Sequence, residues 1–258
     1  IRNMWEKYQQ TLKNKIIFSG VGLHSGINTS LTLEPAEANT GIIFKRTDLQ
    51  KNNLIEANFK NVSSAVLCTK IENEYRVSVS TIEHLMAAFY ICGVDNLIVN
   101  IDGPEVPIMD GSAKDFVEQI NLTGLKNLNS KRKFIKIIKN KKLDLGNKSM
   151  SIEPSINDFT VKFTLTYDNT LINTQIEKTN FDKNSQKDIY TARTFCLFHD
   201  IEKIKSMGLG KGGSLENAVV VKGDKILNEG GLRSKNEFVN HKILDLAGDF
   251  MLTGMRVM

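Results

Sequence analysis

The segment KNEFVNHKILDLAGDF, residues 235–250, carries the longest helical pattern in the sequence. At about 100° per residue, His241, Asp245 and Asp249 fall on one line along the predicted helix. The apolar residues fall on another side of it: Val239, Ile243, Leu246, Ala247 and Phe250. A solvent-exposed face is the ordinary explanation of such a polar line. The alternative is a metal site, because His and Asp one turn apart can bind the same zinc ion.

A second histidine lies at the start of another predicted helix, in the sequence STIEHL, residues 80–85. This sequence fits an S-x-x-E capping box, in which Ser80 and Glu83 exchange hydrogen bonds at the helix start. The alternative is chemical: His84 could bind a metal while Glu83 accepts a proton from the water that the metal activates. Combined with His241 and Asp245, His84 gives two imidazoles and one carboxylate. That set is typical of catalytic zinc sites, which keep a fourth position open.

Composition limits the class of protein. The chain has 258 residues, of which 41% are hydrophobic and 24% charged, which suits a globular protein of two domains. A net charge of +5 suits an anionic small substrate, and we find no aromatic-basic signature of RNA binding. The three cysteines lie far apart, which disfavours a disulfide framework or a thiolate zinc site. The longest apolar run, residues 85–92, is too short to span a bilayer.

Periodicity predicts strands and helices in both halves. Short β-branched and aromatic runs predict strands at residues 15–18, 30–34, 42–44, 97–101, 134–138, 150–153, 159–167 and 218–221. Helices are predicted at residues 82–92, 113–120, 199–206 and 235–250. The polar stretch 127–133 marks a predicted boundary between residues 1–127 and 128–258. A weak echo between LTLEP, residues 31–35, and MSIEP, residues 150–154, agrees with two β-rich units.

An ordered set of motifs covers nearly the whole chain. The motifs are GVGLHSG (20–26), STIEHL (80–85), GPEVPIMDGS (103–112), ARTF (192–195), GGS (212–214), LNE (227–229) and HKILD (241–245). The set resembles bacterial UDP-3-O-acyl-N-acetylglucosamine deacetylases, zinc enzymes of lipid A biosynthesis in Gram-negative bacteria. The resemblance implies an α+β fold of two similar domains, each a sheet layered against helices, with the active site between them.

The same resemblance implies roles for individual residues. Zinc would be held by His84, His241 and Asp245. Glu83 would be the general base, and Thr194 would donate a hydrogen bond to the developing oxyanion. The reaction would be hydrolysis of the N-acetyl amide to give acetate and the free amine.

Further roles follow from the resemblance for residues around this centre. Lys242 would add positive charge near the oxyanion or the substrate phosphates. Asp249 would pair with a histidine of a Gly-His motif that the family carries further along. The sequence ends at Met258 without that motif, so we expect a C-terminally truncated domain that binds zinc but deacetylates poorly. The resemblance implies that the acyl passage is formed by Phe195, Ile201, Gly213 and Ala218. It implies that the nucleotide is contacted by Lys148 and Tyr167.

The expected partner is a UDP-linked acyl amino-sugar, and we expect a cytoplasmic monomer without nucleic acid or stable membrane insertion. The alternative is a non-catalytic protein that binds a nucleotide sugar or a lipid and needs no metal. The amphipathic segment 199–204 fits either a groove for an acyl chain or simple core packing. Stoichiometric zinc distinguishes the enzyme from the binding protein.

Overall fold

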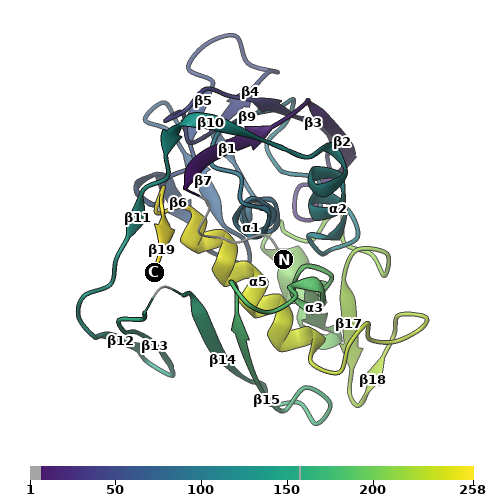
Figure 1. Ribbon diagram of the computed structural model, residues 1–258. Coiled ribbons are helices and arrows are strands. Elements are labelled where there is room, and N and C mark those ends of the chain that lie inside the picture. The colour runs from purple at the N-terminus through teal and green to yellow at the C-terminus, as the bar shows by residue number, and fades with distance from the viewer. Residues whose placement is uncertain (1–6, 157) are drawn as a thin grey trace.

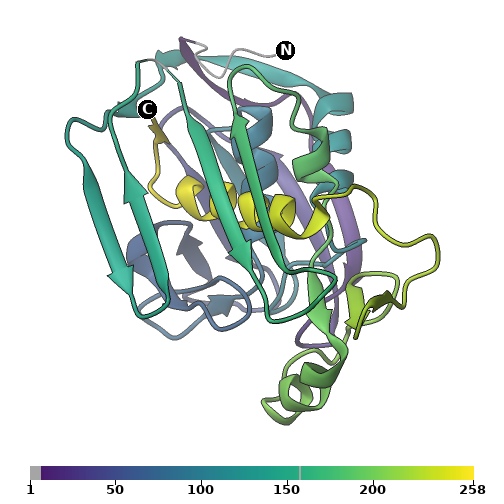
Figure 2. The same cartoon turned by 90° about the horizontal axis from the view of Figure 1, so that it is seen from below.

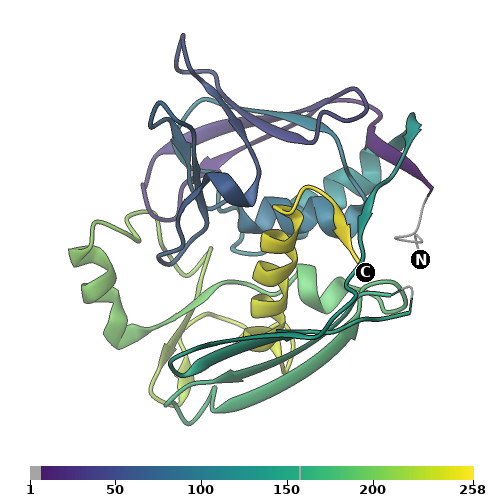
Figure 3. The same cartoon turned by 90° about the vertical axis from the view of Figure 1, so that its left-hand side faces the viewer.

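The computed structural model describes residues 7–156 and 158–258 as a mixed α+β protein (Figure 1), which confirms the predicted fold class. Figure 3 shows two layers of strands with helices between them. None of the described helices has the length and apolar character needed to cross a bilayer.

The first layer is built around a five-stranded sheet with the order β2-β3-β9-β4-β5. Its strands are β2 (Ile16–Val21), β3 (Asn28–Pro35), β4 (Ile42–Arg46), β5 (Leu54–Glu56) and β9 (Leu97–Ile101). Only the β4–β9 pair is parallel. Alternate residues of β3 are buried, as expected for a sheet with one face on the core.

Short elements extend this layer toward the helices. They are η1 (Phe59–Asn61) and the three-stranded sheet of β6 (Val62–Ser64), β7 (Lys70–Glu72) and β8 (Ser78–Val79). The strand β1 (Tyr8–Leu12) pairs with β10 (Leu125–Lys131). The predicted boundary at residues 127–133 therefore falls mainly on a strand that is paired with the N-terminal half, and the division into two domains stays a prediction.

Two helices cover the inner face of the first sheet. Helix α1 (Glu83–Cys92) is buried over nearly its whole length. It ends at Gly93, whose φ of 85° needs a residue that tolerates the left-handed region. Helix α2 (Lys114–Thr123) buries Phe116, Val117 and Ile120, which recur at helical spacing.

The second layer consists mainly of hairpins. They are β12 (Lys141–Leu145) with β13 (Lys148–Ile152), and β14 (Thr160–Thr166) with β15 (Thr174–Asn180). Strand β11 (Phe134–Ile135) pairs in parallel with β19 (Arg256–Val257). The strand predicted at 134–138 is therefore too long, because its partner offers only two residues.

A smaller sheet carries the remaining helices. It joins β16 (Phe195–Leu197), β17 (Val219–Lys222) and β18 (Lys225–Ile226). The short α3 (Lys187–Tyr190) precedes it, and η2 (Phe198–Asp200) with α4 (Ile201–Ser206) leaves it and returns through a loop, as Figure 2 shows. The helix predicted at 199–206 thus begins as a 3-10 turn.

Helix α5 (Glu237–Met251) joins the two layers. It packs against α1 on one side and against β14 and β15 on another. Ile243, Leu244 and Ala247 belong to the same apolar core as α1, as the wheel predicted for Ile243 and Ala247. Cys68 and Cys196 are half-buried thiols, and the buried Cys92 donates its thiol to the carbonyl oxygen of Val117 at 4.0 Å.

Candidate metal centre

Helices α1 and α5 pack against each other (Figure 1), with Glu83 and His84 at the start of α1 next to Gly248 and His241 of α5. Gly248 makes this approach possible, because a Cβ atom at this position would overlap the backbone of Glu83. The rings of His84 and His241 consequently meet edge to face, with centroids 4.8 Å apart and planes at 83°. Two histidines from opposite halves of the sequence therefore face one point.

Asp245 completes this group. Its Oδ1 atom lies 3.4 Å from Nε2 of His84 and 3.3 Å from Nε2 of His241. One ligand atom from each residue lies within 4.8 Å of the others. The Oδ1 atom is buried and accepts no hydrogen bond from any described residue. Ligands of a tetrahedral zinc ion lie about 3.3 Å apart, so these three residues fit a divalent metal ion.

The backbone fixes the tautomer of His241. Its Nδ1 atom lies 2.9 Å from the carbonyl oxygen of Ala192, which can only accept a hydrogen bond. Nδ1 therefore carries the proton, and Nε2 presents its lone pair toward Asp245. Burial lowers the pKa of His241 to about 4, so the ring is neutral at pH 7, as a metal ligand must be.

Lys242 and Asp245 form an ion pair beside the group. The Nζ atom of Lys242 donates to Oδ2 of Asp245 at 3.2 Å, which leaves Oδ1 facing the imidazoles. Burial would raise the pKa of Asp245, but the cationic Lys242 and the two imidazoles that face the carboxylate outweigh it and hold the pKa far below its usual range. The carboxylate is therefore ionised, with Oδ2 bound by Lys242 and Oδ1 left without a hydrogen bond from the described residues.

Glu83 does not form the capping box. Helix α1 begins at Glu83 itself, Ile82 is the N-cap residue, and no side chain caps the helix. That alternative is therefore wrong, because Glu83 stands at the first and not the third helical position. Its Oε2 atom instead accepts the backbone N–H of Thr69 at 3.0 Å. Burial raises the pKa of Glu83 to about 7, where a carboxyl group can both accept and return a proton.

Thr69 links two of the predicted residues, although sequence reasoning missed it. Its hydroxyl group donates to Oδ1 of Asp249 at 2.8 Å, while its backbone N–H holds Glu83. Thr69 and Asp249 are 180 positions apart in the sequence. No local pattern indicates such a pairing.

Glu105 holds the loop that leads into α1. This buried carboxylate accepts the hydroxyl of Thr81 at 2.7 Å and the backbone N–H groups of His24 at 2.9 Å and Ser25 at 2.7 Å. Thr81 has a φ of 57°, in the left-handed region that non-glycine residues seldom adopt. Its conformation is therefore supported by a tertiary contact immediately before Glu83 and His84.

Thr194 and its neighbours approach the centre from the second half of the chain. The N–H of Thr194 donates to the carbonyl oxygen of Gly111 at 2.8 Å, and its own carbonyl accepts from Val219 at 2.8 Å. The Phe195 ring lies 6.5 Å from His241 and 5.6 Å from Tyr167 between centroids. The structure thus brings the predicted Phe195 and Tyr167 next to the metal group.

The other predicted substrate residues lie farther out. Ile201 begins α4, Gly213 lies in the loop after it, and Ala218 is buried just before β17. This excursion is fastened to the first half, because the N–H of Gly210 donates to Nδ1 of His24 at 3.2 Å. Lys148 is exposed at the start of β13, and no described contact joins it to the metal group.

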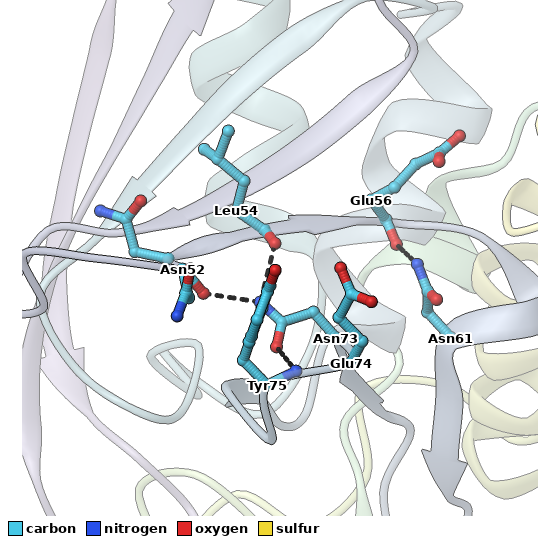
Figure 4. Close-up of a pocket in the computed structure, with 8 residues that line it drawn as sticks. Asn52, Leu54, Glu56, Asn61, Asn73, Glu74 and Tyr75 are labelled. Carbon is cyan, nitrogen blue, oxygen red and sulfur yellow. Dashed lines mark hydrogen bonds between the residues drawn. The ribbon is translucent and has the colours of Figure 1, made fainter.

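A separate hollow of about 460 Å³ lies beside β5 and β7, and no residue of the metal group lines it. Figure 4 shows that its amide side chains already hold backbone groups: Asn73 donates to the carbonyls of Asn52 and Leu54, and Asn61 donates to that of Glu56. These amides stabilise loops. The candidate active site is therefore placed at the three ligand atoms of the metal group and not at this hollow.

Residues 9–258 match the family model of UDP-3-O-acyl N-acetylglycosamine deacetylases. The chain belongs to this family. The match covers both helices of the metal group, as well as the excursion between β16 and β17. The resemblance noted from the ordered motifs is thereby confirmed.

Two bacterial relatives named UDP-3-O-acyl-N-acetylglucosamine deacetylase are similar over nearly the whole chain. The protein from Aliivibrio fischeri is 44% identical over 253 residues, which cover 97% of this chain and 83% of the relative. The protein from Geotalea uraniireducens is 47% identical over 251 residues, which cover 97% and 81%, respectively. Membership of the deacetylase family therefore rests on more than a local motif.

Proposed function

We propose that this chain is a zinc-dependent enzyme that hydrolyses the N-acetyl amide of UDP-3-O-acyl-N-acetylglucosamine. The products are UDP-3-O-acyl-glucosamine and acetate, in lipid A biosynthesis. One observation carries the proposal: the ionised carboxylate of Asp245 points an unpartnered oxygen between the Nε2 atoms of His84 and His241. In a deacetylase family, that donor set suits a catalytic zinc ion.

Zinc bound by these residues supplies Lewis acidity, which polarises the amide carbonyl and makes water a better nucleophile. Glu83 accepts the proton of the attacking water on its carboxylate. A pKa of about 7 means that this group is partly ionised at neutral pH and can pass the proton on. The N–H of Thr69 fixes the direction of the carboxylate, so Glu83 needs no rearrangement before it acts.

Thr194 and Lys242 are proposed to stabilise the charge that develops on the carbonyl oxygen. Thr194 lies two residues after Ala192, whose carbonyl contacts His241, so Thr194 belongs to the segment that borders the metal group. Lys242 is held by Asp245, and this neighbour raises the pKa of Lys242 and keeps it cationic. Asp249 is proposed to hold a further proton-transfer group, with Thr69 fixing its orientation.

The remaining parts of the substrate are assigned to the second half of the chain. We propose that Phe195, Ile201, Gly213 and Ala218 border the acyl chain. Tyr167 and Lys148 are proposed to contact the nucleotide, Tyr167 from a position against Phe195. The enzyme is proposed to act as a cytoplasmic monomer.

Acetate release tests the proposal directly. The full-length parent is stripped of metal with a chelator, reloaded with one equivalent of zinc and compared with Glu83→Gln. Because positioned general bases contribute about 10²–10⁴-fold, the variant is expected to lose that much of kcat while it retains zinc. The matched control is Glu118→Gln, the same chemical change on an exposed position of α2.

Two results would contradict this function. One is full activity of Glu83→Gln, which would remove the proposed base. The other is a parent that neither binds zinc stoichiometrically nor releases acetate, which would favour a non-catalytic protein for nucleotide sugars or lipids.

A further inference from the structure

A buried carboxylate lies one helical turn before His241 and takes no part in the chemistry described above. Glu237 is the first residue of α5 and is only 1% exposed. Its Oε1 atom accepts the backbone N–H of Arg193 at 3.1 Å and its Nε at 2.8 Å. Its Oε2 atom accepts Nη2 of Arg193 at 3.1 Å and the backbone N–H of Arg233 at 2.7 Å. Four donors thus converge on one carboxylate.

These bonds act on a short stretch that borders the metal group, residues 192–194. Ala192 gives its carbonyl oxygen to His241, Arg193 binds Glu237, and Thr194 donates its N–H to Gly111. Helix α5 therefore grips this stretch at two points, Glu237 and His241, which are one turn apart. The orientation of the His241 imidazole and the position of Thr194 therefore both depend on the contacts between α5 and residues 192–194.

Arginine gives this support a defined direction. Its planar guanidinium group meets a carboxylate through two parallel bonds, whereas an ammonium group offers only a point charge. Arg193 uses Nε and Nη2 on Glu237, and Nη2 also reaches the carbonyl oxygen of Gly231 at 2.8 Å. The guanidinium group is therefore fixed by two partners, Glu237 and the carbonyl oxygen of Gly231. It can hold the backbone of residue 193 against α5.

The far side of the stretch is tied in the same way. Arg233 pairs with Asp110 at 2.7 Å and donates to the carbonyl oxygen of Thr191 at 2.9 Å. Gly111, which receives the N–H of Thr194, has a φ of 88°, and a Cβ atom there would overlap the carbonyl of Asn217. Residues 191–194 are thus held by two ion pairs, Arg193 with Glu237 and Arg233 with Asp110, whose charges balance.

We propose that Glu237 is a positioning residue for the deacetylation: through Arg193 it fixes the stretch 192–194 and so sets where the Thr194 hydroxyl stands relative to the metal group. This inference rests on the proposed function. A displacement of about 1 Å at a reacting centre can cost about 100-fold in rate. The contribution of Glu237 is therefore to turnover rather than to substrate affinity.

Kinetics of matched variants test this assignment. In zinc-loaded, full-length enzyme, Glu237→Gln is expected to lower kcat by about 10- to 100-fold, as loss of an orienting partner does at metal sites, with KM little changed. Arg193→Lys keeps the charge but loses the fork, and it is expected to behave in the same way. Glu118→Gln, on an exposed helical position, is expected to match the parent.

A double-mutant cycle separates positioning from general loss of stability. If Glu237 acts through Thr194, then Glu237→Gln costs much less in a Thr194→Ala background than in the parent. The proposal would be overturned if the losses of kcat in the two single variants multiply in the double variant. It would also be overturned if Glu237→Gln has the parental kcat per zinc-containing molecule.

Hydrogen exchange provides a readout that needs no activity. In metal-free protein, Glu237→Gln is expected to speed exchange of the amides of residues 192–194 while those of α1 and β9 stay protected. Uniformly faster exchange across the core would show a merely structural pair and overturn the assignment. A parent that releases no acetate, but whose variant shows the local change, contradicts the proposed function and leaves the positioning contact supported.

Discussion

Replacing Gly248 with alanine tests whether the approach of α5 to α1 builds the metal group. A Cβ atom at this position would overlap the carbonyl oxygen and the carbonyl carbon of Glu83 and would lie tightly against its Cα atom. These are backbone atoms, which cannot rotate away as the end of a flexible side chain can. Helix α5 must therefore move away from the start of α1, on the order of 1 Å, and carry His241 and Asp245 with it.

The effects on stability and on activity should differ in size. Overpacking a core position costs about 1–3 kcal/mol, while alanine gains about 1 kcal/mol over glycine inside a helix. The net loss of unfolding free energy is then at most about 2 kcal/mol. A misplacement of about 1 Å can reduce turnover by about 100-fold. We therefore expect a folded protein with weakened zinc binding and very low activity.

The measurements are urea unfolding, zinc affinity by competition with a chelator, and acetate release. Gly223→Ala is the control, because Gly223 has a φ of 60° and no atom lies within 4 Å of the place that a Cβ atom would take. That change costs about 1–2 kcal/mol of backbone strain without moving α5. Parental zinc affinity and turnover in Gly248→Ala would refute the idea that this contact sets the geometry.

Three further outcomes are expected. Asp245→Asn removes the anionic ligand, so zinc affinity measured by chelator competition should fall by more than about 100-fold, the upper range for outer partners; an unchanged affinity would exclude Asp245 as a ligand. Because burial raises the pKa of Glu83 to about 7, kcat/KM should fall about tenfold per pH unit as the pH drops below that value. A flat profile from pH 5 to 7 would contradict the role of Glu83 as base. Burial would raise the pKa of Glu237, but hydrogen bonds from Arg193 and Arg233 hold it below the ordinary value of 4.5. Its stabilisation is thus complete above pH 4.5 and lost as the pH falls through the lower folded value, so the gap in unfolding free energy between parent and Glu237→Gln should narrow in acid.

The helices at the site were predictable from the sequence because their signals are local. Residues 235–250 show an apolar stripe of helical period, and the structure has α5 from Glu237 to Met251. Gly93 ends α1 in the left-handed conformation that glycine favours. The strand predicted beyond Ile135 fails for the opposite reason, since a strand needs a partner and β19 offers only two residues.

Helical spacing could group metal ligands only where one helix carries two of them. The spacing of His241 and Asp245 places them on one line of α5. A helical wheel shows which face of a helix a residue occupies, but it does not show what packs against that face. It could not show that this line meets α1, which buries His241 to 1% exposure. Thr69 and Glu237 were missed because their roles depend on distant residues: Thr69 holds Glu83 and Asp249, which lie 14 and 180 positions away, and Glu237 holds Arg193, which lies 44 positions away.

The division of the metal group between two distant helices has a consequence for biosynthesis. While the ribosome is still adding the second half of the chain, α1 presents His84 with nothing opposite it. A cation captured early would have only one of its three ligands, so stable loading must wait until α5 has emerged and docked. Zinc would then bind only after both helices have folded, and it would stabilise the contact between them. In cells short of the metal, the protein would accumulate with a less stable contact between α1 and α5.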